Sequence, residues 1–295
     1  MVPERTITST NYQPAVLAPV AAAGRYVVLG LEPRAAIVPL VARLGQVAID
    51  DAIVVGIGEP LVRAVGVQVA GLRTFPALSA ASLAIPSTQG ALFVHVRGDD
   101  QGELLRRVRR VLAGLGDGLR IEEDIVAFRH LTGHDLSGYE DGTENPVDAA
   151  AVAAAIDPDG ASFVAVQRWI HDLGEIERKS STERDALMGR NLETNVELAD
   201  APPSAHVKRA AQESYEPTAF MVRRSMPYGT VGEHGLYFVA FGRSLDAYER
   251  VLTRMAGHED GIVDGLFQFS RPVSGGYYWC PPVRDGRLDL HLLAR

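Results

Sequence analysis

Runs of apolar residues divide the first half of the chain into strand-like and helix-like stretches. Short, bounded runs of Val, Ile and aromatic residues predict strands at 25–32, 51–58, 90–98 and 119–131. Apolar residues at helical spacing predict helices at 33–47 and 100–115, after the first and the third of these strands. The order strand, helix, strand, followed by the same order again, predicts a split βαβ unit whose helices pack on an antiparallel sheet.

The second half repeats this order more loosely. Strands are predicted at 162–171, 219–228, 234–242 and 275–283, and helices at 181–190, 204–212 and 244–257. Ser244 is a favourable N-cap for the last of these helices. We therefore predict an α+β fold made of two similar halves, residues 1–145 and residues 146–295.

The composition is that of a globular protein and argues against several other classes. Of the 295 residues, 46% are hydrophobic and 22% are charged, as in ordinary folded domains. The formal net charge of -8 argues against a nucleic-acid partner, and the basic run at 106–110 has the apolar spacing of an amphipathic helix. No apolar run is long enough to cross a membrane, and the single cysteine, Cys280, cannot form an internal disulfide. We therefore expect a cytoplasmic protein.

A polar loop, Gly138–Pro146, lies at the junction of the two halves and reads GYEDGTENP. Gly, Asp, Asn and Pro are turn residues, so the loop could simply reverse the chain or cap the Ala-rich helix that follows it. Ligand clefts, however, often form between domains. Asp141, which stands between the glycines at 138 and 142, is therefore a candidate functional carboxylate.

Three polar features downstream of this loop are further candidates. His206 lies on a short predicted helix in PPSAHVKRA. Arg223 and Arg224 lie in an otherwise apolar strand, where successive side chains point to opposite faces, so one of them can face a cavity. Asp264 and Gln268 lie on a helix-like turn before an aromatic strand. Taken singly, the histidine could equally be a hydrogen-bonded core residue and the arginines a surface ion pair.

Together and in this order, these motifs resemble those of the dye-decolourising peroxidases, in particular the compact bacterial class. Residues 138–142 match the Gly-x-x-Asp-Gly hallmark of that family, and His206 stands in a matching Ser/Ala-His-Val/Ile-x-Arg setting. Arg223 and Ser225 match its Arg-x-Ser/Asn motif. The similarity runs from the opening YQPAVLAPV to the closing FSRPVSGGYYWCPP. It implies a tandem of ferredoxin-like halves, of the dimeric α+β barrel type, with haem in the second half.

The resemblance also implies a role for each motif. His206 would be the axial ligand of one non-covalent haem b per subunit, which agrees with the absence of a Cys-x-x-Cys-His motif from the sequence. Asp141 would be the distal acid–base group, and Gly142 would let the backbone approach the porphyrin closely. Arg223 would stabilise charge on the departing peroxide oxygen, with Ser225 as a hydrogen-bonding companion.

Two further assignments concern the surroundings of the haem. The axial histidine of this family often donates to an acidic residue, and both Asp264 and Gln268 are possible partners of His206. Arg190, in MGRN, matches an arginine that often lies near the haem propionates. The lysine that commonly follows it is replaced here by Leu192. Arg190 is therefore a candidate for binding the propionates.

The function implied by the resemblance is that of a haem peroxidase, which reduces hydrogen peroxide and oxidises aromatic or dye-like donors by one-electron steps. The alternative is a haem-binding, haem-trafficking or iron-releasing protein with incidental peroxidase activity. Hydrogen peroxide and a small aromatic reductant are the expected partners, and the chain is expected to form a homo-oligomer. Some family members are held in encapsulin shells by a C-terminal docking peptide. The ending RLDLHLLAR shows no such extension, so we expect no encapsulation by that route.

Overall fold

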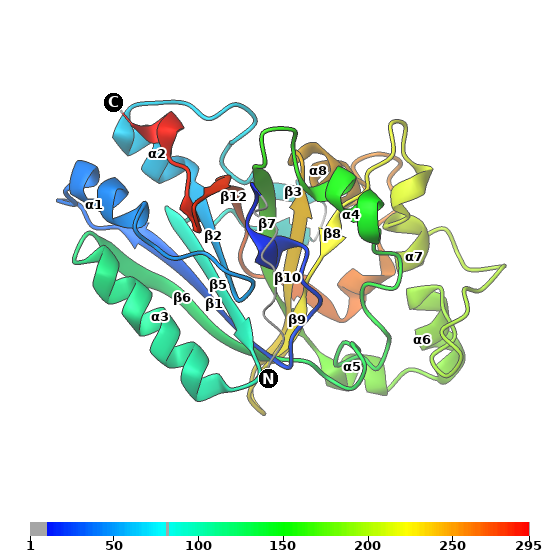
Figure 1. The fold of residues 1–295 in the computed structure, drawn as a ribbon. Coiled ribbons are helices and arrows are strands. Elements are labelled where there is room, and N and C mark those ends of the chain that lie inside the picture. The colour runs from blue at the N-terminus through cyan, green and yellow to red at the C-terminus, as the bar shows by residue number, and fades with distance from the viewer. Residues whose placement is uncertain (1–10, 81–82, 295) are drawn as a thin grey trace, which may run out of the picture.

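The computed structural model describes residues 11–80 and 83–294 and consists of two α+β halves that share one sheet (Figure 1). The elements of the first half are β1 (Ala23–Leu31), α1 (Ile37–Leu44), β2 (Ile53–Gly58), α2 (Glu59–Val65), β3 (Leu78–Ala80), β4 (Leu83–Ile85), β5 (Leu92–Gly98), α3 (Gln101–Leu115) and β6 (Leu119–Phe128). Those of the second half are α4 (Asp148–Ala155), β7 (Ser162–His171), α5 (Leu173–Glu177), α6 (Ser181–Met188), α7 (His206–Arg209), β8 (Val222–Arg223), β9 (Met226–Gly229), β10 (His234–Gly242), α8 (Asp246–Met255), β11 (Ser270–Pro272), β12 (Gly276–Cys280), β13 (Val283–Arg284) and β14 (Arg287–Leu288).

The order of the strands in the main sheet is that of two ferredoxin-like units. The first half contributes the order β2-β5-β1-β6, and the second contributes β12-β7-β10-β9. In each unit the first strand in sequence lies between the third and the fourth, and all the pairings are antiparallel. The predicted α+β fold of tandem ferredoxin-like halves is therefore confirmed. The boundary at residues 145 and 146 falls in the connection between β6 and β7 and stays a prediction.

The two units join edge to edge and close the sheet into a barrel. β12 pairs with β2 at Tyr278 and Trp279, and β6 pairs with β9 at Ala127 and Tyr228. Because β10 also pairs with β7, the ring β7-β12-β2-β5-β1-β6-β9-β10 returns to its start. The last strand of this ring in sequence, β12, thus bridges β7 of the second half and β2 of the first.

Large side chains fill the interior of this barrel. Successive residues of a strand point to opposite faces, so Tyr26, Phe93, Tyr237 and Tyr278 gather inside while their neighbours pack on the outer face. The ring of Tyr26 stacks on that of Tyr237 with centroids 4.2 Å apart, and Phe93 stacks on Tyr278 at 5.4 Å. The barrel interior is therefore a packed core, and a large ligand has to bind outside it.

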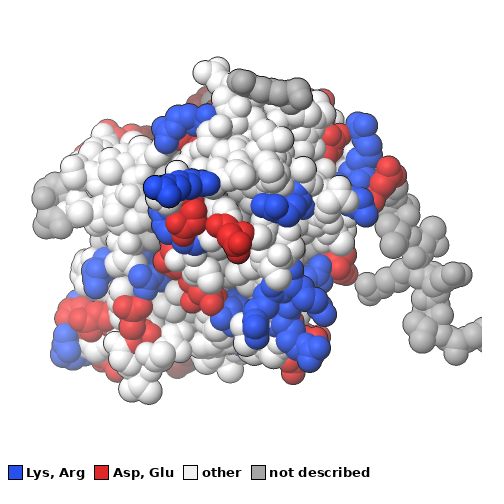
Figure 2. Space-filling model, turned by 90° about the vertical axis from the view of Figure 1, so that its left-hand side faces the viewer, with Lys and Arg blue, Asp and Glu red and all other residues white. Residues whose placement is uncertain are grey.

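Helices cover the outer face of the sheet. In the first half, Leu104, Val108 and Leu115 of α3 are buried, while the arginines at 106–110 are exposed or half-buried. The predicted amphipathic helix at this basic run is thus confirmed. Figure 2, which looks onto the side that carries α1 and α3, shows basic side chains interspersed with acidic ones. No helix in the described part of the chain is both long and apolar enough to span a membrane.

Among the predicted elements whose bounds differ in the structure, two have a serine at the changed boundary. The strand predicted at 219–228 is divided into β8 and β9, because Val239 of β10 donates its N–H to the Oγ of Ser225 in place of a backbone carbonyl. Helix α8 begins at Asp246 instead of at Ser244, whose Oγ accepts the N–H of Asp246 at 3.3 Å. In both places a serine hydroxyl competes with the backbone for a hydrogen bond and shifts the element boundary.

Candidate haem site

A large cavity separates the sheet of the second half from its helices. β7 and β10 form one wall, α8 forms another, and the loop at 139–144 that joins the two halves forms a third. The space between these walls is about 1320 Å³ when its open mouth is included. The apolar residues of its lining include Leu236, Phe238, Val251, Leu252 and Met255. The cavity is therefore suited to a large, mainly apolar ligand.

His206 is the first residue of the short helix α7 and lines this cavity. Its Nδ1 donates to Oδ2 of Asp264 at 2.9 Å, and Asp264 is only 1% exposed. The other carboxylate oxygen, Oδ1, accepts the N–H of Leu266 at 2.8 Å. Burial lowers the pKa of His206, but the charge of Asp264 and the hydrogen bond to it raise the pKa above its ordinary value overall. Because Nδ1 is held in this way, Nε2 is the atom that can bind a metal.

The structure decides between the two predicted partners of His206. Asp264 caps the 3-10 helix Gly265–Gln268 and contacts the imidazole, whereas Gln268 is exposed and lies outside the cavity lining. In the structure Asp264, and not Gln268, is therefore the hydrogen-bonding partner of His206. Sequence spacing could not separate the two residues because both lie on one helical turn. A carboxylate partner makes the imidazole more electron-rich than an amide would.

Asn145 joins the loop of Asp141 to the strand of Arg223. Its Oδ1 accepts the N–H of Arg223 at 2.7 Å, and its Nδ2 donates to the carbonyl of Arg223 at 3.1 Å. The amide side chain thus pairs with β8 as a neighbouring strand would. Gly142 has a φ of 73°, and a Cβ at this position would lie 2.8 Å from Nδ2 of Asn145. Glycine is therefore needed at 142 to let Asn145 reach Arg223.

Asp141 and Arg223 line the same cavity as His206. The Nε of Arg223 is buried and has no hydrogen-bond partner among the described residues. The guanidinium of Arg224, in contrast, donates to the backbone carbonyls of residues 17 and 18. The two arginines therefore extend in different directions from the strand, as predicted. A buried guanidinium nitrogen without a partner is a place where a ligand can supply the acceptor.

Ser225 and Arg190 lie differently from what was expected. Ser225 is buried outside the cavity lining, and its Oγ accepts the N–H of Val239, so the geometry does not support a place beside the peroxide. Arg190 lines the cavity, but its Nη2 pairs with Glu144 at 2.8 Å and with Glu197 at 2.6 Å. A haem propionate would have to share Arg190 with these two glutamates. Its propionate-binding role stays a prediction.

A buried group of polar side chains in the same cavity was not predicted. Nε2 of His171 lies 3.0 Å from Oδ1 of Asp135, and Nδ1 lies 2.7 Å from Oγ of Ser270. Asp135 also accepts the N–H of Ser137, within the turn that leads to Asp141. The contact between His171 and Asp135 therefore fixes the start of the loop that carries Asp141 to β7. No motif marks it, because residues 36 positions apart come together only in the fold.

We expect Asp135→Asn to lower the free energy of unfolding by about 2–3 kcal/mol at neutral pH. Burial raises the pKa of Asp135, but His171 and the hydrogen bonds from Ser137 lower it overall to about 2. Because the pKa in the folded state lies below the ordinary 3.8, the carboxylate stabilises the fold above that pH, and this contribution is lost as the pH falls toward 2. Urea unfolding of both proteins at several pH values measures the effect. A difference that does not vary with pH would contradict this origin.

These residues fit a haem group. His206 can hold the iron through Nε2, and the apolar walls can hold the porphyrin. Asp141 and Arg223 line the same space and leave polar groups free for a further ligand. Within the described ranges, no cluster of three or more His, Cys, Asp or Glu side chains could hold a metal ion.

A family model and related proteins that match this sequence are all described as dye-decolorizing, or Dyp-type, peroxidases. Residues 132–285 match the family model described as Dyp-type peroxidase, C-terminal. The chain is 31% identical over 224 residues to the dye-decolorizing peroxidase of Mycobacterium tuberculosis, which covers 72% of this chain and 67% of that protein. It is 31% identical over 230 residues to that of Mycolicibacterium paratuberculosis, which covers 74% of this chain and 65% of that protein. The chain thus spans about two thirds of the length of these relatives.

Solved structures share the fold over almost the whole chain. DyPB of Rhodococcus jostii matches with a TM-score of 0.82 at 27% identity, over 92% of this chain and 96% of that chain. A variant of it in complex with heme matches with a TM-score of 0.82 at 28% identity, over 92% and 97%. The encapsulated DyP-type peroxidase of Mycobacterium smegmatis matches with a TM-score of 0.82 at 26% identity, over 93% and 96%. The family match over residues 132–285 and the 31% identity to the Mycobacterium tuberculosis protein show that this chain belongs to the Dyp-type, or dye-decolourising, peroxidase family.

Proposed function

We propose that this protein is a haem b peroxidase that reduces hydrogen peroxide and oxidises aromatic or dye-like donors in one-electron steps. One observation carries the proposal: His206, paired with the buried Asp264, lines the same cavity as Asp141 and Arg223. A metal ligand and groups for proton transfer and charge stabilisation around one apolar cavity are what a haem peroxidase requires. The family of the chain and the heme of a solved neighbour support the proposal further.

Each side chain of the site has a definite part in this function. Haem bound at His206 would supply the iron that reacts with peroxide and takes electrons from the donor. The carboxylate of Asp141 can take the proton from one peroxide oxygen and give it to the other. Arg223 can orient the peroxide and stabilise negative charge on the departing oxygen. Asp264 holds Nδ1 of His206 and so directs Nε2 to the iron.

Repeated peroxide cycles on the haem-loaded protein test this function. We expect the haem absorbance to change rapidly on adding one equivalent of hydrogen peroxide and to return when an aromatic donor is added, over many cycles. Free haem at the same concentration gives the background. Bleaching in the first cycle, or transfer of the iron to a chelator during the cycles, would instead favour a haem-trafficking or iron-releasing protein.

We further propose that the protein self-associates and works in the cytoplasm. The single cysteine, Cys280, is buried and free, as is usual for proteins of a reducing compartment. Analytical ultracentrifugation at micromolar concentration measures the association, and a monomer there would contradict it. Encapsulation is a described property of the mycobacterial neighbour, and co-expression with a shell protein tests whether this chain is taken up as well.

A further inference from the structure

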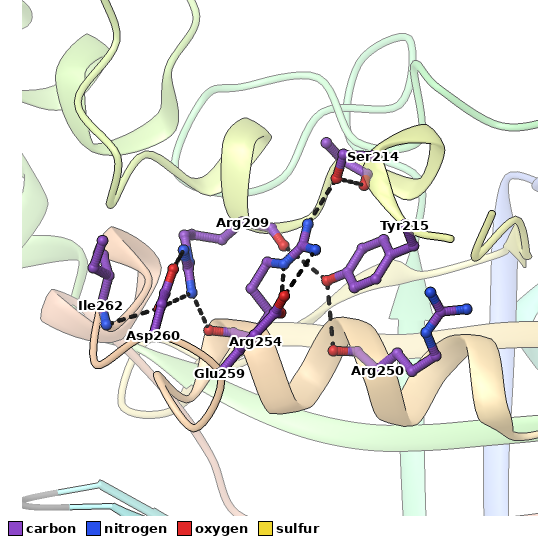
Figure 3. Close-up of polar contacts among 9 residues, drawn as sticks. Arg209, Ser214, Tyr215, Arg250, Arg254, Glu259, Asp260 and Ile262 are labelled. Carbon is purple, nitrogen blue, oxygen red and sulfur yellow. Dashed lines mark hydrogen bonds and ion pairs between the residues drawn. The ribbon is translucent and has the colours of Figure 1, made fainter. Parts of the chain in front are cut away.

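Arg209 lies on the same short helix as His206 and ties this helix to the end of α8, as Figure 3 shows for Arg209 and Arg254. Arg209, the last residue of α7, is charged and yet only 4% exposed. Its Nη1 and Nη2 donate to the two carboxylate oxygens of Asp260 at 2.7 and 2.8 Å. Nη2 also donates to the carbonyl of Arg254 at 2.6 Å. A bidentate ion pair of this kind fixes the relative orientation of the guanidinium and the carboxylate as well as their distance.

Asp260 stands on the same short segment as Asp264, the partner of His206. This segment, residues 256–264, connects α8 to the next 3-10 helix. The N–H of Asp264 donates to the carbonyl of Met255 at 2.9 Å, which anchors one end of the segment. Arg209 follows His206 by three residues, and Asp260 precedes Asp264 by four. The contact between Arg209 and Asp260 therefore joins the segment that carries the histidine to the segment that carries its carboxylate.

Tyr215 and Arg254 also contact Arg209 through its backbone carbonyl and its guanidinium, respectively. The guanidinium carbon of Arg254 lies 3.6 Å from the ring centroid of Tyr215, and its Nε pairs with Glu259 at 2.7 Å. The hydroxyl of Tyr215 donates to the carbonyl of Arg209 at 3.3 Å, and Figure 3 shows these side chains above α8. None of these residues lines the cavity, nor does Asp260. Any effect that they have on the haem is therefore indirect.

We propose that Arg209 is a positioning residue, which sets the strength of the hydrogen bond between His206 and Asp264 and thereby the reduction potential of the haem. The helix α7 has four residues, and helices shorter than ~12 residues do not hold their shape alone in water. A hydrogen bond also weakens steeply when its angle departs from linearity. The contact with Asp260 therefore keeps the imidazole electron-rich. The proposal rests on the proposed function in taking His206 as the axial ligand.

The Arg209→Lys variant tests this proposal, because lysine keeps the charge and loses the two-pronged contact. The readouts are the iron–histidine stretching band of the ferrous protein in resonance Raman spectra and the Fe(III)/Fe(II) reduction potential. We expect the band at lower frequency and the potential more positive, as in Asp264→Asn, because a weaker hydrogen bond makes the imidazole less electron-rich. Arg250→Lys is the matched control, because Arg250 also lies over the ring of Tyr215, at 4.9 Å, and donates to the carbonyl of residue 217.

A double variant separates positioning from a loss of stability. If Arg209 acts through Asp264, then Arg209→Lys adds no shift in potential to that of Asp264→Asn. Asp260→Asn weakens the same contact from the other partner, and the side chain of Asp260 is 40% exposed. This variant replaces Arg209→Lys in the experiment if Arg209→Lys does not fold. An additive shift, or an unchanged band and potential in a folded variant, would overturn the proposal. A wild-type protein without an iron–histidine band would overturn the axial role of His206 as well, so the two failures are distinguished without turnover.

Discussion

His206→Ala is expected to leave the purified protein without stably bound haem. Nε2 of His206 is the nitrogen available to the cavity, since Nδ1 is bonded to Asp264. Loss of a hydrogen-bonding partner behind a metal ligand costs ~10–100-fold in affinity, and loss of the ligand itself costs more. We therefore expect haem to dissociate at least about 100-fold faster than from the wild type.

Haem content after gel filtration and the rate of haem transfer to apomyoglobin measure this effect. Added imidazole is expected to restore part of the binding, because it can occupy the space that the side chain leaves. His258→Ala is the control, since His258 is exposed and lies outside the cavity lining. Full haem content in His206→Ala would show that another group holds the iron.

Asp141→Ala and Arg223→Leu are each expected to slow the reaction with hydrogen peroxide while haem remains bound. Acid–base groups contribute ~10²–10⁴-fold to such rates, and a preorganised group that stabilises developing charge contributes ~10²–10³-fold. Each single variant should therefore react at least about 100-fold more slowly than the wild type. The double variant should lose less than the product of the two effects, because both groups act on the same oxygen–oxygen bond.

Rapid mixing of the haem-loaded protein with hydrogen peroxide gives the second-order rate constant of the first absorbance change. Glu140→Gln is the matched control for Asp141→Ala. Glu140 precedes Asp141 on the same loop and also lines the cavity, but its carboxylate is bonded to Thr132 and Asn195. Haem content is measured in every variant so that loss of cofactor is not mistaken for loss of reactivity. Unchanged rate constants in both distal variants would contradict the roles assigned to them.

The strands could be predicted because their apolar pattern is local. The predicted ranges 162–171 and 234–242 coincide with β7 and β10. The pairing that closes the barrel could not be read from such patterns, because it joins Tyr278 of β12 to Gly58 of β2. Periodicity shows which face of a strand is buried and does not show which strand lies beside it. The barrel type was therefore expected from the family resemblance alone.

The candidate site likewise contains residues that the sequence marks and residues that only the fold brings into place. The motifs of Asp141, His206 and Arg223 were visible in the sequence, and all three residues line one cavity. Apart from Asp264, the residues that hold them in place were not visible, because each acts through a partner far away in the chain. Asn145 reads as a turn residue until its two hydrogen bonds with Arg223 are seen. Arg209 closes the motif around His206, but its partner Asp260 lies 51 positions away and is not marked in the sequence.

The position of β12 in the ring also constrains how the protein is made. The ribosome completes β2 and β7 long before it adds residues 276–280 of β12. Until then β2 has an unpaired edge, and so has the part of β7 that pairs with β12, residues 162–166. Such edges pair readily with other chains. β7 also forms a wall of the haem cavity, so this wall gains its full support only when the ring closes. A chain that ends before β12 is therefore expected to aggregate more readily than the 295-residue chain.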